Sequence, residues 1–425
     1  MHNRRWRHFT SLLIFSLAGS GFAQQSTPLT WEQVRDRFEV RNPTLLADKL
    51  NIDESKAGEI TANLRPNPTF SLTADGTQIA PSNGVWQPFA GTFISPGVSF
   101  EIERRHKRHL RFESAQKATT IAEFAHADVE RGLIFTLRSE FVGILQAKAV
   151  RQLAQDDLDY WDKVLDVSRT RFSAGDIAQI DLDRLELQRA QYEADLQAAQ
   201  EALEDAKIHL LSMLNDRTPM DEFDVVGPYE FSDQLPPRDD VRKTALDSRP
   251  DLKAALAAVD KARTDHTLAI ANGSTDPTLS FWYTHNGSYN NPAATNTLGV
   301  SINIPLRLFD RNQGEKLRTQ LDIDRNQRLY DATEAQVFAD VDSSYASVET
   351  DVGLLRPYKA KYLDLSVRVR DTITFSYQHG GASLLDFLNA QSEYRSTQLN
   401  YINLVASYLT AAAQLNMAAG REVIQ

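Results

Sequence analysis

The sequence contains no cysteine. This absence excludes disulfide bonds, thiolate metal sites and a lipid anchor attached to an N-terminal cysteine. The formal net charge of -11 also disfavours a nucleic-acid partner, which calls for a concentrated basic face. We therefore expect a non-lipidated protein that does not bind nucleic acid.

Long apolar runs are missing after the first 23 residues. At the start, three arginines precede an apolar run from Leu12 to Ala18, and Gly21-Phe22-Ala23 fits a signal-peptidase cleavage site. This pattern predicts a signal peptide over residues 1–23, and hence export. The alternative is an anchoring helix, but the run is shorter than the roughly 20 residues that a membrane span needs.

Proline and glycine are scarce in two long stretches with helical spacing. Residues 104–171 contain no proline and only two glycines, and residues 312–377 form a similar stretch with Pro357 inside it. Each would form a helix roughly 100 Å long. A proline inside an ideal helix costs about 3 kcal/mol, so we expect a kink or local break there. The apolar seam of the second stretch includes Phe338, Val341, Tyr345, Val348, Val352 and Leu355, and the last helix carries a looser seam from Leu385.

Each long stretch ends in a glycine turn that leads into another helical stretch. Gly175 and Gly380-Gly381 can adopt the left-handed backbone angles that end a helix. Residues 172–182 align with residues 377–387, glycine on glycine and aspartate on aspartate. The alignment indicates an internal repeat.

The repeat predicts two structural halves. We expect the first half at residues 24–214, an equatorial connector at 215–240, the second half at 241–420 and a tail at 421–425. Each half is predicted as helix, strand, strand, long helix, turn and helix. The expected strands lie near 68–76, 92–103, 277–285 and 297–306, and the expected hairpin turns near 175 and 380.

The four short strands alternate apolar and polar residues. Four strands cannot close a membrane barrel, which needs at least about eight, but three copies supply twelve. We predict a mainly α-helical fold with a small β part, in which a trimer forms a 12-stranded outer-membrane β-barrel and a coiled-coil tunnel. A soluble β-sandwich hairpin or an extended fibre is the alternative. The predicted lipid-facing residues are Phe70, Leu72, Val98, Phe100, Leu279, Phe281, Val300 and Ile302.

Other residues in and near the strands are assigned to the lumen and to the membrane interface. The candidates for an interfacial aromatic girdle are Trp86, Trp282 and Tyr283. Those for the lumen are Ser71, Ser99, Glu101, Ser301 and Asn303.

Several sequence motifs occur in a consistent order and at consistent spacings along the chain. They are Arg249-Pro250-Asp251-Leu252, the strand starts after Pro68 and Pro277, the segment Ile304-Pro305-Leu306-Arg307-Leu308-Phe309-Asp310, and both glycine turns with the aspartate that follows. Together they resemble the TolC-like outer membrane efflux protein family over essentially all of residues 28–420. Three further features are similar to its CzcC-like heavy-metal branch: Phe309-Asp310-Arg311-Asn312-Gln313-Gly314-Glu315, Pro357, and Glu101 followed by Arg104, Arg105, Lys107 and Arg108.

The resemblance implies a passive outer membrane channel of a tripartite efflux pump. It implies a homotrimer whose barrel contacts outer membrane lipid and whose tunnel projects into the periplasm. A periplasmic adaptor, or membrane fusion protein, would join it to an inner-membrane transporter, expected to be of the proton-driven resistance-nodulation-division type. The branch similarity makes heavy-metal cations the expected substrates. A channel for drugs or organic solutes, a channel for type I protein secretion, and a pore-less exported coiled-coil protein stay open as alternatives.

The resemblance also implies roles at the glycine turns. Asp386 matches an acidic position at which three chains narrow the tunnel, and a carboxylate ring there would attract cations. Family members often carry a second acid one turn later, where this sequence has Asn389. Asp181 is the equivalent position in the first repeat, and in the family such a residue can bond to the tyrosine that is Tyr377 here. A helix N-terminal aspartate favoured by the helix dipole is the alternative for Asp386. The tips expected to dock the adaptor are Gly175, Asp176, Gly380, Gly381 and Leu384.

Residue sets typical of enzymes are lacking in the sequence. It shows no Ser-His-Asp set, phosphate-binding glycine loop or carboxylate pair in a pocket-like context. His106 and His109 stand three apart and could share a metal ion on a helix, but no third ligand lies nearby in the sequence. We expect no catalytic residue, no cofactor and no metal site.

Overall fold

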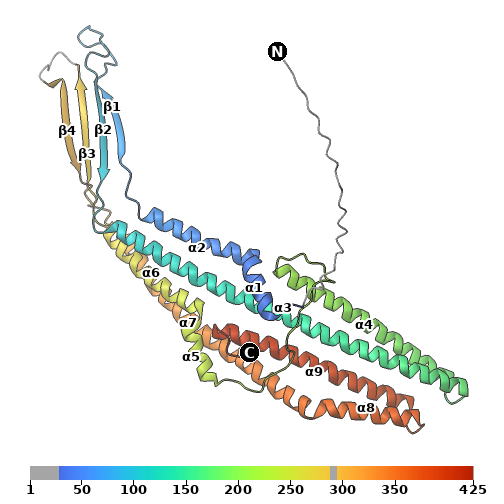
Figure 1. Cartoon of the computed structure of the whole chain (residues 1–425). Helices are drawn as coiled ribbons and strands as arrows, with labels where there is room; N and C mark the ends of the chain where they lie inside the picture. The colour runs from blue at the N-terminus through green and yellow to red at the C-terminus, as the bar shows by residue number, and fades with distance from the viewer. Residues whose placement is uncertain (1–27, 288–293, 425) are drawn as a thin grey trace, which may run out of the picture.

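The computed structural model describes residues 28–287 and 294–424. The predicted signal peptide and the end of the predicted tail, residue 425, lie outside the described residues. Within them the chain forms long helices and one small antiparallel sheet, as predicted (Figure 1). The first half contains α1 (Trp31–Arg41), α2 (Pro43–Ala62), β1 (Thr69–Asp75), β2 (Phe93–Glu101), α3 (Lys107–Ala174) and α4 (Gln179–Met213). The second half contains α5 (Arg238–Ser248), α6 (Pro250–Asn272), β3 (Thr278–Asn286), β4 (Asn296–Asn303), α7 (Gln313–Pro357), the π-helical turn η2 (Tyr358–Tyr362), α8 (Leu363–Gln378) and α9 (Leu384–Ala419).

The molecule is elongated, with the sheet at one end and both helical hairpin turns at the other (Figure 1). Helix α3 alone has 68 residues and spans roughly 100 Å. The strands follow each other in space in the order β1-β2-β3-β4, and every neighbouring pair is antiparallel. Strands β1 and β4 are therefore the two edges of an open sheet in a single chain.

The break between α1 and α2 follows from local capping. Thr30 and Gln33 form a reciprocal capping box at the start of α1. The Asn42 side chain accepts a hydrogen bond from the Leu45 amide, and Pro43 occupies the first position of α2, where its missing amide has no cost. The same arrangement of two helices around an X-Pro step recurs at Arg249, between α5 and α6.

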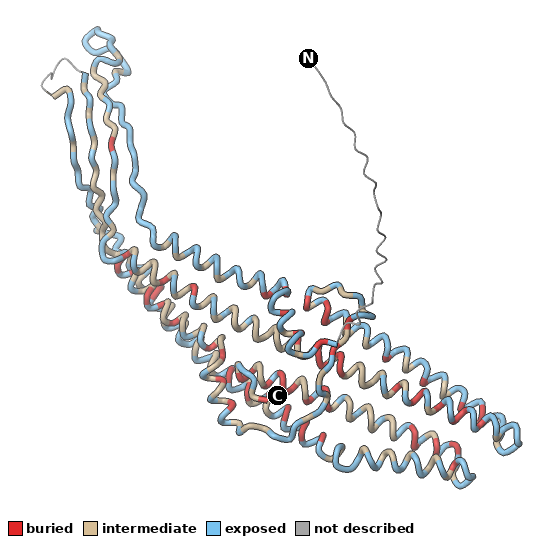
Figure 2. Tube along the Cα trace, in the orientation of Figure 1, coloured by how far each residue is buried: buried red, intermediate tan, exposed pale blue. Residues whose placement is uncertain are grey.

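Three buried clusters hold the helices together, and they lie along the helical seams (Figure 2). The first cluster joins α5, α7 and the end of α9 around Leu355 and Tyr408. The second joins α1, the middle of α3 and the end of α4 around Phe38 and Phe141. The third lies near the hairpin turns and surrounds Trp161. Buried clusters of this kind are typical of long helices that pack side by side along their length, and not of a compact globular domain.

The seam of α7 follows the predicted heptad with one shift at its start. Val341, Val348, Val352 and Leu355 are buried as predicted, but Phe338 is 38% exposed and Val337 is buried in its place. An ideal helix drifts relative to a strict seven-residue repeat, so a seam read from one end moves by a residue over several turns.

The expected kink at Pro357 is present as a π-helical turn. Pro357 ends α7, and residues Tyr358–Tyr362 form the wider turn before α8 continues the rod. The Leu363 amide donates to the Tyr358 carbonyl oxygen, which is the spacing of a π-helix. The chain thus absorbs the proline without ending the helix. Among the described residues, no helix is both long enough and apolar enough to cross a membrane.

Candidate functional site

The strand register gathers all eight predicted lipid-facing residues on one face of the sheet. Directly opposite residues in antiparallel strands share a face. Phe70 pairs with Val98, Val98 with Phe281, and Phe281 with Val300, which gives one continuous apolar row. The neighbouring rows contain Leu72, Phe100, Leu279 and Ile302. Many of these side chains are exposed in the single chain, with Phe70 at 68% and Ile302 at 65%.

The opposite face of the sheet is lined by small and polar residues, with two exceptions, Phe93 and Trp282. Ser99 pairs with Ser280, and Ser280 with Ser301, in one row. In the next row the indole of Trp282 lies against Gly299, and the Cβ atom of Trp282 lies close to Gly97.

Trp282 was predicted for the membrane interface, and the register shows that it is on the face opposite Phe281. The prediction considered residue type alone and did not use the strand register, which separates Trp282 from the apolar rows. The glycines opposite Trp282 were the signal that it packs across this face, because a Cβ atom at Gly299 would overlap the indole ring.

Both hairpin turns are closed by left-handed glycines. Gly175 has φ of 84° and ends α3, and its amide donates to the Phe172 carbonyl. Gly380 has φ of 78°, and the amide of the following Gly381 donates to the Ser376 carbonyl at 2.7 Å. Nothing lies within 4 Å of a Cβ atom built at Gly175 or Gly380, so the turns are open to solvent. Asp176 is exposed beside the first turn.

Asp386 forms the capping box of α9. Its carboxylate accepts hydrogen bonds from the Ser383 hydroxyl at 2.7 Å and from the Ser383 amide at 3.1 Å, and Ser383 caps the Asp386 amide in return. The hydroxyl first, and then the amide, hold the pKa of Asp386 below its usual range. Asp386 and Asn389 are both exposed, and Asp386 is therefore an ionised surface group with a structural partner.

Leu384, expected at the docking tip, is buried against the third cluster at 8% exposure. Leu385, expected in the seam, is 64% exposed. Leu384 is thus the buried leucine and Leu385 the exposed one, because the capping box sets the register of the first turn of α9.

Tyr377 is packed inside the tip. Its ring stacks on Phe387 with centroids 4.9 Å apart, and the Arg171 guanidinium lies 5.5 Å from its centroid. Burial raises the pKa of Tyr377, Arg171 opposes this shift, and Asp181 adds to it. The Tyr377 hydroxyl is buried and has no hydrogen-bond partner among the described residues, so the bond to Asp181 that the resemblance implies is not formed in this chain.

A charged network behind the tip was not found from the sequence. Arg395 of α9 lies 2.5 Å from the Asp195 carboxylate of α4 and 3.6 Å from the Asp157 carboxylate of α3. Burial raises the pKa of Asp157 to about 6, although Arg395 and Arg370 oppose the shift. These side chains connect three helices near the tip. Asp157 stands in a helix rich in acidic residues, and nothing in the sequence distinguishes it from its exposed neighbours.

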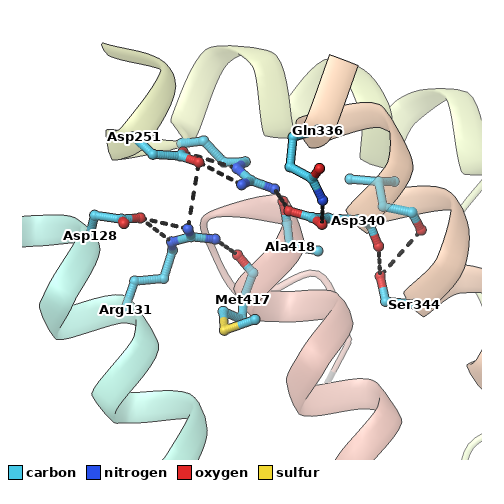
Figure 3. Close-up of polar contacts among 10 residues, drawn as sticks. Asp128, Arg131, Asp251, Gln336, Asp340, Ser344, Met417 and Ala418 are labelled. Carbon is cyan, nitrogen blue, oxygen red and sulfur yellow. Dashed lines mark hydrogen bonds and ion pairs between the residues drawn. The ribbon is translucent and has the colours of Figure 1, made fainter. Parts of the chain in front are cut away.

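A second network lies at the equator, where the Arg249-Pro250-Asp251-Leu252 motif meets α7 and α9. Arg249 is 3% exposed and forms two hydrogen bonds to Asp251, at 2.6 and 3.0 Å, and one to Asp340 at 2.7 Å. Arg131 of α3 lies between Asp128 and Asp251 and donates to the Met417 carbonyl (Figure 3). Burial opposes ionisation of Asp251, but the bonds from Arg249 outweigh it and hold the pKa of Asp251 below its usual range. The motif was recognised in the sequence, but its role in joining helices was not.

No group of three or more His, Asp or Glu side chains is arranged to hold a metal ion within residues 28–287 and 294–424. His106 is the N-terminal cap of α3 and His109 lies in its first turn.

The chain matches known proteins over most of its length. The profile of the family described as "Outer membrane efflux protein" matches residues 34–216 and 241–421. The cobalt-zinc-cadmium resistance protein CzcC of Cupriavidus metallidurans is 22% identical, over 93% of this chain and 90% of CzcC. The pyoverdine export outer membrane protein OpmQ of Pseudomonas aeruginosa is 23% identical over 76% of this chain and 68% of OpmQ. A crystal structure of CusC superposes with a TM-score of 0.77, at 16% identity, over 93% of both chains.

Proposed function

The chain belongs to the outer membrane efflux protein family, and from this premise we propose that three copies form a closed duct that exports heavy-metal cations. The protein is a passive outer membrane efflux channel with a large periplasmic part, and it is not an enzyme. What we propose beyond this are the assembly, the roles of the tip residues, the partners and the substrate.

The open four-stranded sheet carries the proposal of a trimer. A single chain leaves the backbone of β1 and β4 at two sheet edges and leaves one face apolar, and such edges are prone to pair with other strands. Because the four strands alternate in direction, β4 of one copy can pair with β1 of the next as a normal antiparallel pair. Three copies then supply twelve strands, an even number within the range of outer membrane barrels.

The first test is assembly and conduction by the purified protein. We expect a trimer in detergent that separates into monomers on heating, and stepwise ion conductance after insertion into a planar bilayer. A protein found only as a monomer in the soluble periplasm would contradict the duct and favour the pore-less coiled-coil alternative.

The heavy-metal substrate rests on the similarity to CzcC, whose name refers to cobalt, zinc and cadmium resistance. The similarity to OpmQ, named for pyoverdine export, supports an organic solute as the second candidate. Deletion of the gene is expected to lower growth in zinc, cobalt or cadmium. Unchanged metal tolerance together with a new sensitivity to drugs or organic chelators would contradict the metal proposal.

We assign adaptor docking to the hairpin tips. The open turns at Gly175, Asp176, Gly380 and Gly381 protrude at the end opposite the sheet (Figure 1). Leu385 replaces Leu384 in this proposal because it is the exposed leucine. The partners would be a periplasmic adaptor and a proton-driven inner-membrane transporter.

We assign the aperture to Asp386, Asn389, Asp181 and Tyr377 as a second proposal for the same end. Three copies of Asp386 would place three ionised carboxylates around the threefold axis. Asp386→Asn is expected to lower the preference of the pore for cations, whereas Asn389→Ala is not.

A further inference from the structure

We propose that a collar of arginines at the sheet end of the molecule binds the phosphate groups of anionic phospholipids. The basic collar comprises Arg65, Arg104, Arg105, Arg108, Arg307 and Arg311. This inference rests on the proposed function, because it requires the sheet to cross the membrane.

The collar lies where the strands meet the helices. Arg65 stands between α2 and β1, Arg104 and Arg105 between β2 and α3, and Arg307 and Arg311 between β4 and α7. Arg108 is in the first turn of α3. These connections lie together at one end of the sheet (Figure 1). Arg105 and His106 both have φ of 57°, so the chain turns sharply there, and both side chains are exposed.

Two of the acidic residues near the collar, Asp276 and Glu103, are engaged by other cations, whereas Glu101 and Asp310 form no ion pair with the residues that the structure describes. Lys107, which is buried, pairs with Asp276, and Arg111 pairs with Glu103. No collar arginine forms an ion pair with any residue that the structure describes. Residues 101–111 contain five basic and two acidic residues, in a chain whose net charge is -11. Positive charge is therefore in excess at this place.

Exposed apolar side chains lie beside these arginines. Leu306, Leu308 and Phe309 are 79%, 64% and 90% exposed, and Arg307 is between them in the chain. A row of bare apolar side chains next to unpaired guanidinium groups is unfavourable in water. At a membrane interface the apolar groups enter the acyl region, and the arginines reach the phosphates.

The length of the strands places the collar at headgroup level. Strands of 7 to 9 residues rise about 3.3 Å per residue, and at the usual barrel tilt of about 35–45° they span roughly 16–24 Å, most of the hydrocarbon layer of about 25 Å around an outer membrane barrel. Residues just beyond the helical end of the strands then lie beside the phosphates of the periplasmic leaflet. Planar guanidinium groups bind phosphate oxygens in a bidentate manner.

Lipid retention by the purified trimer tests the proposal. The trimer would be exchanged into mixed micelles of phosphatidylglycerol and phosphatidylcholine, and bound lipids counted by native mass spectrometry. We expect the wild type to prefer phosphatidylglycerol. The variant Arg104→Gln/Arg105→Gln/Arg311→Gln is expected to reduce that preference by at least about tenfold, since each basic residue near an anionic surface contributes a factor of about five.

Three arginines far from the collar provide the matched control. Arg184, Arg328 and Arg368 are also exposed and form no ion pair with the described residues. The variant Arg184→Gln/Arg328→Gln/Arg368→Gln removes the same charge and is expected to keep the wild-type preference. Equal loss in both triple variants would show a general charge effect and overturn the proposal.

Two further measurements separate the possible outcomes. Millimolar inorganic phosphate is expected not to displace the lipid, and displacement would mean that the collar is a soluble-anion site. Conductance in uncharged phosphatidylcholine bilayers reports on the duct alone. If the wild type conducts but shows no preference for phosphatidylglycerol, the lipid-binding proposal is wrong and the channel proposal stands. If the protein neither trimerises nor conducts, both proposals are wrong.

Discussion

At the scale of single residues, Trp282 and Gly299 form a matched pair on the small-residue face of the sheet. The indole occupies the space that any side chain at Gly299 would need. Gly97 also approaches Trp282, from the other side. An aromatic ring laid over glycines shields their backbone and fixes the strand register. The pair therefore contributes to the order of β2, β3 and β4.

Gly299→Ala is expected to disrupt the sheet, because the new methyl group overlaps the Trp282 ring. The cost should resemble that of overpacking a core, about 1–3 kcal/mol. The additional change Trp282→Ala should restore part of the stability, and thermal dissociation of the trimer measures both. Gly143→Ala serves as the control because nothing lies within 4 Å of a Cβ atom there, and it should be neutral or slightly stabilising. Additive effects of the two sheet substitutions would contradict the contact.

The environment of Asp157 predicts how the stability of the protein depends on pH. Its folded pKa of about 6 is above the ordinary value of 3.8, so the fold disfavours its ionised form. The penalty is fully present above pH 6 and is relieved as the pH falls towards 4. Asp157→Asn should therefore stabilise the protein at pH 7.5 by on the order of 2 kcal/mol, and this gain should vanish near pH 4. Arg395 retains Asp195 as its partner in this variant.

Unfolding midpoints measured across this pH range would check the prediction. The neighbouring Asp156 is exposed, and Asp156→Asn should change stability by less than about 0.5 kcal/mol at every pH. A destabilised Asp157→Asn at pH 7.5 would mean that the ion pair with Arg395 outweighs the burial of Asp157.

At the scale of elements, the π-helical turn η2 adjusts the register of the last rod. A π turn holds more residues than an α-helical turn, so it behaves as a one-residue insertion. Removing Lys361, an exposed residue of η2, together with Pro357→Ala should restore a regular helix and keep α8 in register. Removing Arg368 within α8 should instead rotate the helix by about 100° and displace the buried Tyr377.

Circular dichroism and trimer yield compare the two deletions. The Lys361 deletion should retain a folded trimer, and the Arg368 deletion should not. Similar losses in both variants would mean that the π turn itself is required, for example as a hinge.

The elements differ in how far the sequence could predict them. Heptad spacing and scarce prolines predict the long helices, and Asn42-Pro43 predicts the break that the structure has between α1 and α2. The alternation of apolar and polar residues along each strand predicts that the sheet has one apolar and one polar face. It does not predict where Trp282 packs, because that depends on glycines brought opposite by pairing. The sequence pattern likewise does not predict which of Leu384 and Leu385 is buried, since the register there is set by the bond between Ser383 and Asp386.

The charged networks around Arg249 and Asp157 could not be predicted from the sequence, for a related reason. Each connects residues far apart in sequence, such as Arg249 and Asp340 or Asp157 and Arg395. A charged residue in a long helix is most often solvated, and only the packing of the helices shows which ones are buried. The pattern of charged residues along the sequence therefore cannot identify which charged side chains are buried.

At the scale of the whole molecule, the proposed duct gives the two faces of the sheet different solvents. The apolar row of Phe70, Val98, Phe281 and Val300 would contact lipid, and the row of Ser99, Ser280 and Ser301 would line a water-filled lumen. Phe281 and Ser280 are adjacent in β3 and point to opposite faces. An equal charge placed at each position therefore compares the two environments at almost the same depth.

Phe281→Arg is expected to destabilise the inserted trimer by about 2–4 kcal/mol, because a cation on the lipid face near the bilayer midplane has no water to solvate it. Ser280→Arg places the same side chain in the lumen, so it should leave the trimer intact and alter conductance instead. Trimer dissociation temperature and single-channel conductance measure the two effects. If both substitutions destabilise the trimer equally, the two faces of the sheet are in the same environment, and the sheet does not form the wall of a pore. If only Phe281→Arg loses it, the apolar face is in contact with lipid and more than one copy must close the wall, because the described residues of one chain supply four strands.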